Sequence, residues 1–216
     1  MVNIANIGYK LEVDKSSIEQ VLSVGLYRLL GNRLDKKKID IIKDIRNIFL
    51  LHFQRHPTYE SLLSGELQGE FGLTDSKNKL DIISNAIAES LKIVVQQVSI
   101  KGGKLKGGLI ITSDLAEMSN VLASPAAVQS TEKGQQLPWL EWLLYRGDTQ
   151  IVREYQYVKS ARHSRTGKGI MRKNVKRTWG VPPQYAGVAG KNFLTEVFDN
   201  ANQDIIQYIK SNMEKF

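Results

Sequence analysis

"LKIVVQQVSIKGGKLKGGLIIT", residues 91–112, is the stretch in which the chain changes from helical to strand-like patterning. Before it, apolar residues recur every three or four positions. From about Ile93 the residues are β-branched and partly alternate with polar ones, which predicts a strand. KGGKLKGG, 101–108, is a natural hairpin connection, and LIIT, 109–112, is the expected partner strand. The chain is therefore expected to place helices before an antiparallel sheet.

Upstream of this stretch the pattern is helical. A first helix is expected over about 16–30, opened by a Ser-x-x-Glu capping box and stopped by Gly31-Asn32. A second fits about 36–54, and a glycine-punctuated segment, 57–74, is expected to be short-helical. Asp75 or Ser76 can cap a third long helix. The chain thus begins with a helical part, to about residue 92.

Downstream, shorter elements follow. PWLEWLLY, 138–145, predicts an aromatic helix, and TQIVREYQYV, 149–158, predicts a strand. Residues 159–178 are interpreted as a long basic loop, and TWGVPPQYAGVAG as an ordered turn region. The last segment has an apolar stripe typical of an amphipathic helix, formed by Leu194, Val197, Phe198, Ala201, Ile205 and Ile209.

These elements predict an α+β fold with N-terminal helices, a small antiparallel β-sheet with interleaved helices, and a C-terminal amphipathic helix. A single domain over 1–216 is expected, with a helical part to about 92 and a sheet-containing part from about 93.

Composition limits the function classes. The 216 residues are 42% hydrophobic and include no cysteine, which excludes disulfides, thiolate metal sites and a cysteine nucleophile. The sequence contains no apolar run of about 18 residues, so no membrane span is predicted. The N-terminus shows no secretion signal. We expect a protein made in a cytoplasm. Its formal net charge of +8 favours polyanionic partners.

The charge gathers in one segment. Between Arg153 and Lys191 there are ten Lys and Arg residues and a single acid, Glu154. Such residues neutralise phosphates without recognising base sequence, although a solvated loop has the same composition. We expect this segment, including SRTGKGIMRK at 164–173, to be a flexible loop that faces DNA in a lumen or docks on a protein. Its candidate contact residues are Arg162, Arg165, Lys168, Arg172, Lys173, Lys176 and Arg177.

No catalytic, cofactor or metal site is predicted. Gly167-Lys168 lacks the upstream glycine and the following Ser or Thr of a phosphate-binding loop. His52, His56 and Glu60 have metal-ligand spacing but are interrupted by a proline, so ordinary helix-end roles are favoured. Glu66 and Glu70 are interpreted as a solvated helix face rather than an acid–base pair. The chain is not expected to be an enzyme.

The three tryptophans are a further candidate set. Trp is favoured both in cores and at interfaces. Simple core packing and a subunit interface therefore both remain open for Trp139, Trp142 and Trp179.

Four segments together resemble a known protein family. They are PTYESLLSGELQGEFGL, LPWLEWLLYRGD, SRTGKGIM and WGVPPQYAGVAGKNFLTEVFD, within residues 57–74 and 137–200. Their order is similar to that in the neck and tail-completion proteins of tailed, especially contractile-tailed, bacteriophages. These include head–tail connectors and tail terminators.

The resemblance implies a structural virion protein without catalytic residues. Such proteins form rings that join the DNA-filled head to the tail or terminate the tail, and the genome passes through the lumen. A homo-oligomer is implied, a hexamer in preference to a dodecamer. Its neighbours would be other neck proteins, a portal adaptor, or tail-tube or sheath proteins. Its location would be the virion neck, after assembly in the host cytoplasm. The alternative is a non-specific nucleic-acid-binding protein with no virion role.

Overall fold

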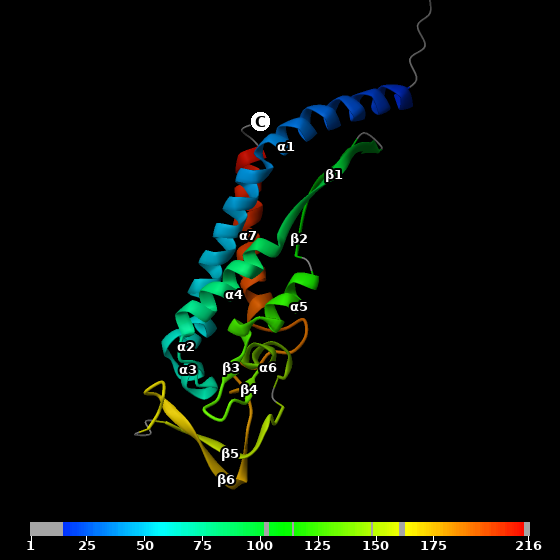
Figure 1. Cartoon of the computed structure of the whole chain (residues 1–216). Coiled ribbons are helices and arrows are strands. Elements are labelled where there is room, and N and C mark those ends of the chain that lie inside the picture. The colour runs from blue at the N-terminus through cyan, green and yellow to red at the C-terminus, as the bar shows by residue number, and fades with distance from the viewer. Residues whose placement is uncertain (1–14, 102–103, 114, 148, 160–162, 214–216) are drawn as a thin grey trace, which may run out of the picture. The chain divides into compact units, whose positions relative to one another are not determined.

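The structure is a computed structural model, and it describes residues 15–101, 104–113, 115–147, 149–159 and 163–213. Helices and two-stranded sheets follow one another along the chain (Figure 1), and the predicted α+β class with a C-terminal helix is confirmed. The chain divides into two compact units, Met1–Ile39 with Ile93–Ile111, and Asp40–Lys92 with Thr112–Phe216. Within the described residues, no helix combines the length and apolar character needed to cross a membrane.

The first unit contains the N-terminal part of α1 (Lys15–Arg55) and most of a two-stranded sheet, β1 (Leu91–Lys101) with β2 (Lys104–Ser113). The predicted helix stop at Gly31 is wrong, because α1 continues through it. A glycine inside a helix costs only about 1 kcal/mol, which a long helix tolerates. The predicted connection at 101–108 is too long, because β2 already begins at Lys104.

The core of the second unit is built on the C-terminal part of α1. Ile41, Ile45, Phe49 and Phe53 recur every four residues and are buried, as one face of a helix requires. Against them packs α7 (Phe193–Met213), where the predicted apolar stripe is confirmed, with four members buried and Phe198 and Ile209 partly exposed. The Phe49 and Phe198 rings stack with centroids 4.8 Å apart.

Polar contacts join the same two helices. His52 Nε2 lies 2.8 Å from Asp204 Oδ2, and His56 Nε2 lies 3.2 Å from Glu196 Oε2. Tyr208 donates its hydroxyl proton to Asp44 at 2.5 Å. These histidines therefore contact α7 carboxylates, in agreement with the helix-end interpretation, and no group of metal-ligating side chains occurs among the described residues.

Shorter helices cover the remaining core of this unit. They are α2 (Pro57–Ser64), α3 (Glu66–Phe71), α4 (Ser76–Ser90), α5 (Leu115–Ala123), the 3-10 turn η1 (Pro125–Ala127) and α6 (Trp139–Tyr145). Gly72, in the left-handed conformation at φ 66°, ends α3, as the glycine pattern predicts. The short strands β3 (Gln129–Ser130) and β4 (Gln136–Leu137) pair antiparallel in a region that the sequence left unassigned.

The last sheet is an antiparallel ribbon of β5 (Val152–Lys159) and β6 (Gly169–Trp179). The predicted loop over 159–178 is therefore wrong for most of its length. A two-stranded ribbon exposes much of both faces, so its strands lack the apolar alternation that identifies a half-buried strand. Backbone pairing with β5 orders the basic residues of β6.

Candidate functional site

The β5–β6 ribbon contains a large bulge. Arg153 pairs with Thr178 and Tyr155 pairs with Lys173, so Glu154 alone opposes residues 174–177. Glu154 has φ 62°, in the left-handed region that residues other than glycine rarely adopt. Bulges and such backbone outliers gather at functional sites because they redirect side chains. The bulge therefore indicates that the ribbon is a candidate binding surface.

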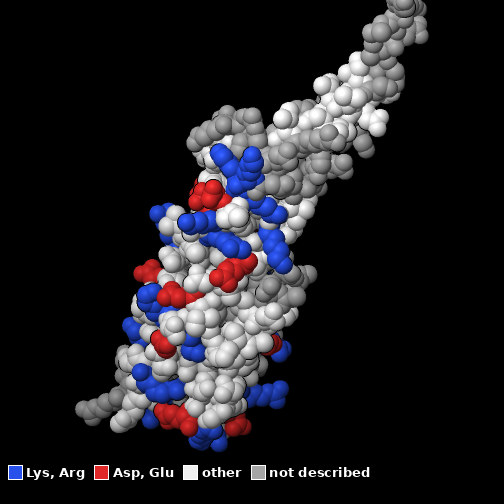
Figure 2. Space-filling view, turned by 45° about the horizontal axis from the view of Figure 1, so that its top comes forward, with Lys and Arg blue, Asp and Glu red and all other residues white. Residues whose placement is uncertain are grey.

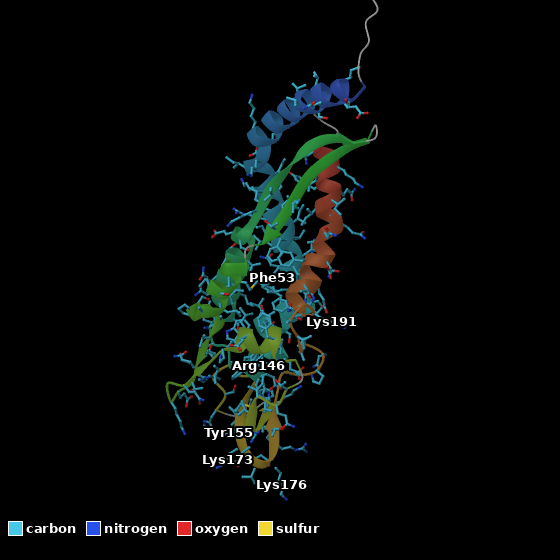
Figure 3. All side chains as sticks on the ribbon, turned by 90° about the vertical axis from the view of Figure 1, so that its right-hand side faces the viewer. Phe53, Arg146, Tyr155, Lys173, Lys176 and Lys191 are labelled. Carbon is cyan, nitrogen blue, oxygen red and sulfur yellow. The ribbon has the colours of Figure 1, made fainter. Side chains whose placement is uncertain are left out.

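Four of the predicted contact residues lie at this bulge, and all four are exposed: Arg172, Lys173, Lys176 and Arg177. Figure 3 places Lys173 and Lys176 at the end of the ribbon, away from the core residue Phe53. Among the described residues, their one recorded ion pair is a long contact of 4.0 Å between Lys173 Nζ and Glu154 Oε2. These cations are therefore available to an external anion.

Asn174 fixes the shape of the bulge. Its Nδ2 donates to Gln156 Oε1 at 3.0 Å, and its Oδ1 accepts from the backbone N–H of Lys176 at 3.1 Å. Val175 is 69% exposed beside these polar contacts. The basic side chains are thus presented from a hydrogen-bonded backbone rather than from the flexible loop that we expected.

The remaining predicted contact residues precede the strand. Arg165 and Lys168 are exposed in the turn before β6, and Arg162 lies outside the described residues. Arg165 Nη1 donates to the backbone oxygen of Ser130 at 3.2 Å. In the same turn, Ser164 Oγ donates to the carbonyl of Gly169 at 2.6 Å.

The Tyr157 side chain lies so close to Gly69 and Gly169 that neither position has room for a Cβ atom. A Cβ added to Gly69 would lie 2.0 Å from Tyr157 Oη, and one added to Gly169 would lie 2.5 Å from the same oxygen. The pKa of Tyr157 is raised, chiefly by burial. Gly169 belongs to the segment that we expected to be a flexible loop, but its lack of a side chain serves packing against Tyr157. The tyrosine ring thereby joins α3 to both strands.

Two α3 carboxylates bind the ribbon. Glu66 Oε1 lies 2.8 Å from Lys159 Nζ at the end of β5, and its Oε2 accepts from Gln184 Nε2 at 3.0 Å. Glu70 Oε2 accepts a hydrogen bond from the Trp179 indole N–H at the end of β6. Both side chains are partly buried, so the solvated-face interpretation is wrong.

Glu70 is the titratable group most affected by this packing. Burial raises its pKa to about 7; the Trp179 hydrogen bond opposes the rise, the Glu66 carboxylate adds to it, and Lys159 opposes it. A carboxyl with a raised pKa can donate a hydrogen bond in its protonated form and accept hydrogen bonds in either form. Groups with such properties are typical of binding and catalytic sites.

The tryptophans surround the same helix. Trp139 is fully buried and donates to the carbonyl of Ala126 at 3.0 Å, and Trp179 is 6% exposed, whereas Trp142 is partly exposed. The Trp142 and Trp179 ring centroids lie 5.9 Å apart, as do those of Phe71 and Trp179. Trp139 and Trp179 therefore belong to the core, and Trp142 is the one with surface available to a partner.

A cavity of about 550 Å³ opens beside this cluster. Its wall includes Glu70, Phe71, Trp142, Trp179 and, from the ribbon, Tyr155 and Met171. That volume lies within the range of small-molecule sites, which combine apolar walls with a few polar groups. Two features of the sequence indicated this site, namely Glu66 and Glu70 four residues apart and the clustered tryptophans, but neither indicated that these residues lie close together.

The segments that carry the family resemblance meet around this site. The backbone N–H of Gly147 donates to the Gly187 carbonyl at 2.6 Å, and the N–H of Gly187 donates to the Leu143 carbonyl at 3.1 Å. The N–H of Ile151 donates to the Trp179 carbonyl at 2.8 Å. Backbone hydrogen bonds thus join segments that are distant in the sequence.

Basic and acidic side chains are interspersed over the face seen in Figure 2, so the net charge does not form one continuous field there. The exposed Lys and Arg residues of β6 are therefore a local basic cluster. Comparison with protein-family models, with curated proteins and with solved structures finds no match to this chain.

Proposed function

We propose that this chain is a structural subunit of a bacteriophage neck ring, a head–tail connector or tail terminator, through which the genome passes. The observation that carries the proposal is the β5–β6 ribbon, which presents Arg172, Lys173, Lys176 and Arg177 from an ordered bulge. The four-segment resemblance supplies the virion context, and the ribbon supplies a surface for DNA or for an adjoining ring.

The ribbon suits a weak and sequence-independent contact. Lys and Arg bind phosphates by charge, and recognition of base sequence needs further directional contacts in a groove. A small number of exposed cations gives an interaction that salt weakens and that DNA can slide past. This is what a lumen requires, because the genome has to move through it.

Assembly into a ring needs further surface for contacts between copies. Ile18, Val21, Leu22 and Leu29 lie on α1 at helical spacing and are 44%, 72%, 52% and 62% exposed. Exposed apolar stripes of this kind mark interaction sites, and a repeated contact between identical copies closes into a ring. We favour a hexamer over a dodecamer. Its neighbours would be neck, portal-adaptor or tail-tube and sheath proteins. In this proposal the protein has no catalytic role or cofactor and is assembled in the host cytoplasm for the virion neck.

A non-specific nucleic-acid-binding protein without a virion role is the second candidate, and the same ribbon favours it. The two differ in affinity and assembly. A dedicated binder would hold duplex DNA tightly with a steep salt dependence, on the order of 0.9 log units per log unit of salt for each phosphate contact. A ring subunit would bind duplex weakly and oligomerise.

Native mass spectrometry of the purified protein over a range of concentrations tests the first candidate. We expect a closed hexamer. A monomer at every concentration, combined with tight and strongly salt-dependent duplex binding, would overturn the ring proposal in favour of the second candidate.

A pair of charge-reversal variants tests the ribbon itself. Arg172→Glu with Lys173→Glu should reduce duplex binding and lower the salt slope by about 2, because two phosphate contacts are lost. The matched control is Lys191→Glu with Lys210→Glu, which reverses the same charge at exposed positions outside the ribbon. Equal losses in both variants would show that net charge, not the ribbon, determines binding.

A further inference from the structure

Charged side chains line the cavity beside the tryptophans at two depths. Glu70 is partly buried and stands among the aromatic walls, whereas Lys133, His163 and Arg165 line the cavity from exposed positions. The exposed positions place these basic groups at the rim. The cavity therefore presents the Glu70 carboxyl group inside and, at its rim, three basic side chains and one acidic side chain, Glu132.

The inner carboxyl has unused hydrogen-bonding capacity. Glu70 Oε2 accepts from the Trp179 indole, and among the described residues no hydrogen bond is recorded for Oε1. Oε1 is not one of the described buried atoms that lack a partner, so it is accessible to a ligand that donates a hydrogen bond. The ligand should present N–H groups to Glu70.

The walls and the rim specify the rest of the ligand. Trp142, which is partly exposed, offers aromatic surface that suits a flat ring, whereas Phe71 and Trp179 are only 2% and 6% exposed. No carboxylate pairs with Lys133 or Arg165 among the described residues, so both can receive an anion. A simple cation would have to pass these basic groups on a chain of net charge +8, which disfavours it. A flat ring with N–H donors and an anionic group satisfies every part.

We propose that this cavity binds a nucleotide, with the base against Trp142 and its N–H groups directed to Glu70, and with the phosphate at Arg165 and Lys133. Guanine fits best because its adjacent N1–H and exocyclic amino group can donate together to one carboxylate. Cytosine and adenine offer a single amino group and uracil a single ring N–H, so none of the three can donate from two adjacent nitrogens to one carboxylate. The site lies within one chain and does not depend on ring assembly.

Binding should depend on pH in a defined direction. Because burial raises the pKa of Glu70 to about 7, the carboxylate that accepts both guanine protons is mostly formed above that pH. Glu66 on α3, Tyr157 and Lys159 from β5, and the Trp179 indole from β6 act on this carboxyl. Affinity for guanosine monophosphate should therefore rise from pH 6 to pH 8. The other charged groups lining the cavity are Glu132, Lys133, His163 and Arg165.

Calorimetric titration of the full chain with GMP, CMP, AMP and UMP tests the proposal. Tryptophan fluorescence gives a second readout, because two of the three tryptophans line the cavity and the third lies beside them. GMP should bind about fivefold or more tightly than UMP, since a bidentate pair contributes about 1–3 kcal/mol of discrimination. Ribose 5-phosphate should bind weakly, because it lacks the base.

Two variants and a control assign the contacts. Glu70→Gln should remove both the preference for GMP and its pH dependence, because the amide presents one acceptor where two are needed. Arg165→Ala should weaken all nucleotides by a similar factor. Arg146→Ala removes an exposed arginine that does not line the cavity and pairs with Glu141, and it should change nothing.

Three results would overturn the inference. Equal affinity for GMP and ribose 5-phosphate would reduce the site to a phosphate contact. Binding of arginine amide without binding of GMP would identify a socket for a basic protein side chain. Absence of any saturable binding, in protein whose thermal unfolding is intact, would refute a ligand site altogether.

Discussion

Replacing Glu70 by glutamine should make the protein more stable at alkaline pH. The folded structure raises the pKa of this carboxyl from 4.5 to about 7, mainly by burial, so the folded state binds the proton more tightly than the unfolded state. Stability from this group is complete below pH 4.5 and is lost as the pH rises through 7. Glutamine has no charge to bury and keeps an oxygen for the Trp179 indole.

The size of the effect follows from the pKa change. A difference of roughly 2.5 units at about 1.36 kcal/mol each sets an upper limit of about 3 kcal/mol. Glu70 retains some exposure to solvent, which screens the interaction, so about 1–2 kcal/mol is the realistic expectation. The free energy of unfolding of the variant should thus exceed that of the wild type by about 1–2 kcal/mol at pH 8 and by about a quarter of that at pH 5.

Urea unfolding followed by circular dichroism between pH 5 and pH 8 measures this difference. Taking variant minus wild type cancels the titration of all other groups. Glu60→Gln, at an exposed position on α2, removes the same formal charge and is the matched control for the effect of net charge. If the Glu70→Gln difference is flat from pH 5 to pH 8, the burial argument is refuted.

Two further predictions concern packing, and thermal unfolding measures both. Gly169→Ala should destabilise by about 1–3 kcal/mol, since its Cβ would lie 2.5 Å from Tyr157 Oη; Gly25→Ala, with nothing within 4 Å, should leave stability unchanged or raise it by up to about 1 kcal/mol. A harmless Gly169→Ala would show that Tyr157 does not rely on this contact. Phe53→Ala should cost about 3–5 kcal/mol because Phe53 is fully buried, whereas Leu51→Ala at a 43% exposed position should cost below about 1 kcal/mol; similar losses in the two would contradict the assignment of the core.

Sequence periodicity predicted the long helices of the second unit because each buries one continuous face. Leu80, Ile83 and Ile87 of α4 repeat at helical spacing and are buried, and Leu194 and Val197 of α7 do the same. Periodicity does not show whether a helix tolerates a glycine. The predicted helix end at Gly31 was therefore wrong.

Strand β6 escaped prediction for the opposite reason. From Arg172 to Thr178, Asn174 alone is partly buried and the rest are exposed, so local sequence contains no burial pattern. The order of the strand comes from its pairing with β5 and from its two ends, where Gly169 and Trp179 are buried. Those ends pack on α3, and their partners lie far away in sequence.

The candidate cavity could be anticipated only in part. Clustered tryptophans and paired glutamates are visible in the sequence, but the burial that raises the Glu70 pKa comes from the tertiary fold, and its hydrogen-bond partner Trp179 lies 109 positions away. A four-residue spacing of carboxylates on a helix is ordinary on a solvated surface. Only the tertiary contact with Trp179 separates this pair from the common case.

The residues that fix the ribbon in place differ from those that give it positive charge. The role of the charge can therefore be tested without disturbing the fold. The buried ends, Gly169 and Trp179, fix the ribbon on α3, whereas Arg172 and Lys173 are exposed, with a 4.0 Å ion pair at most. Substitutions at such exposed positions usually change stability by less than about 0.5 kcal/mol. Charge reversal at the bulge should therefore leave the fold intact, so a loss of DNA binding or of assembly in that variant would reflect the lost contact and not unfolding.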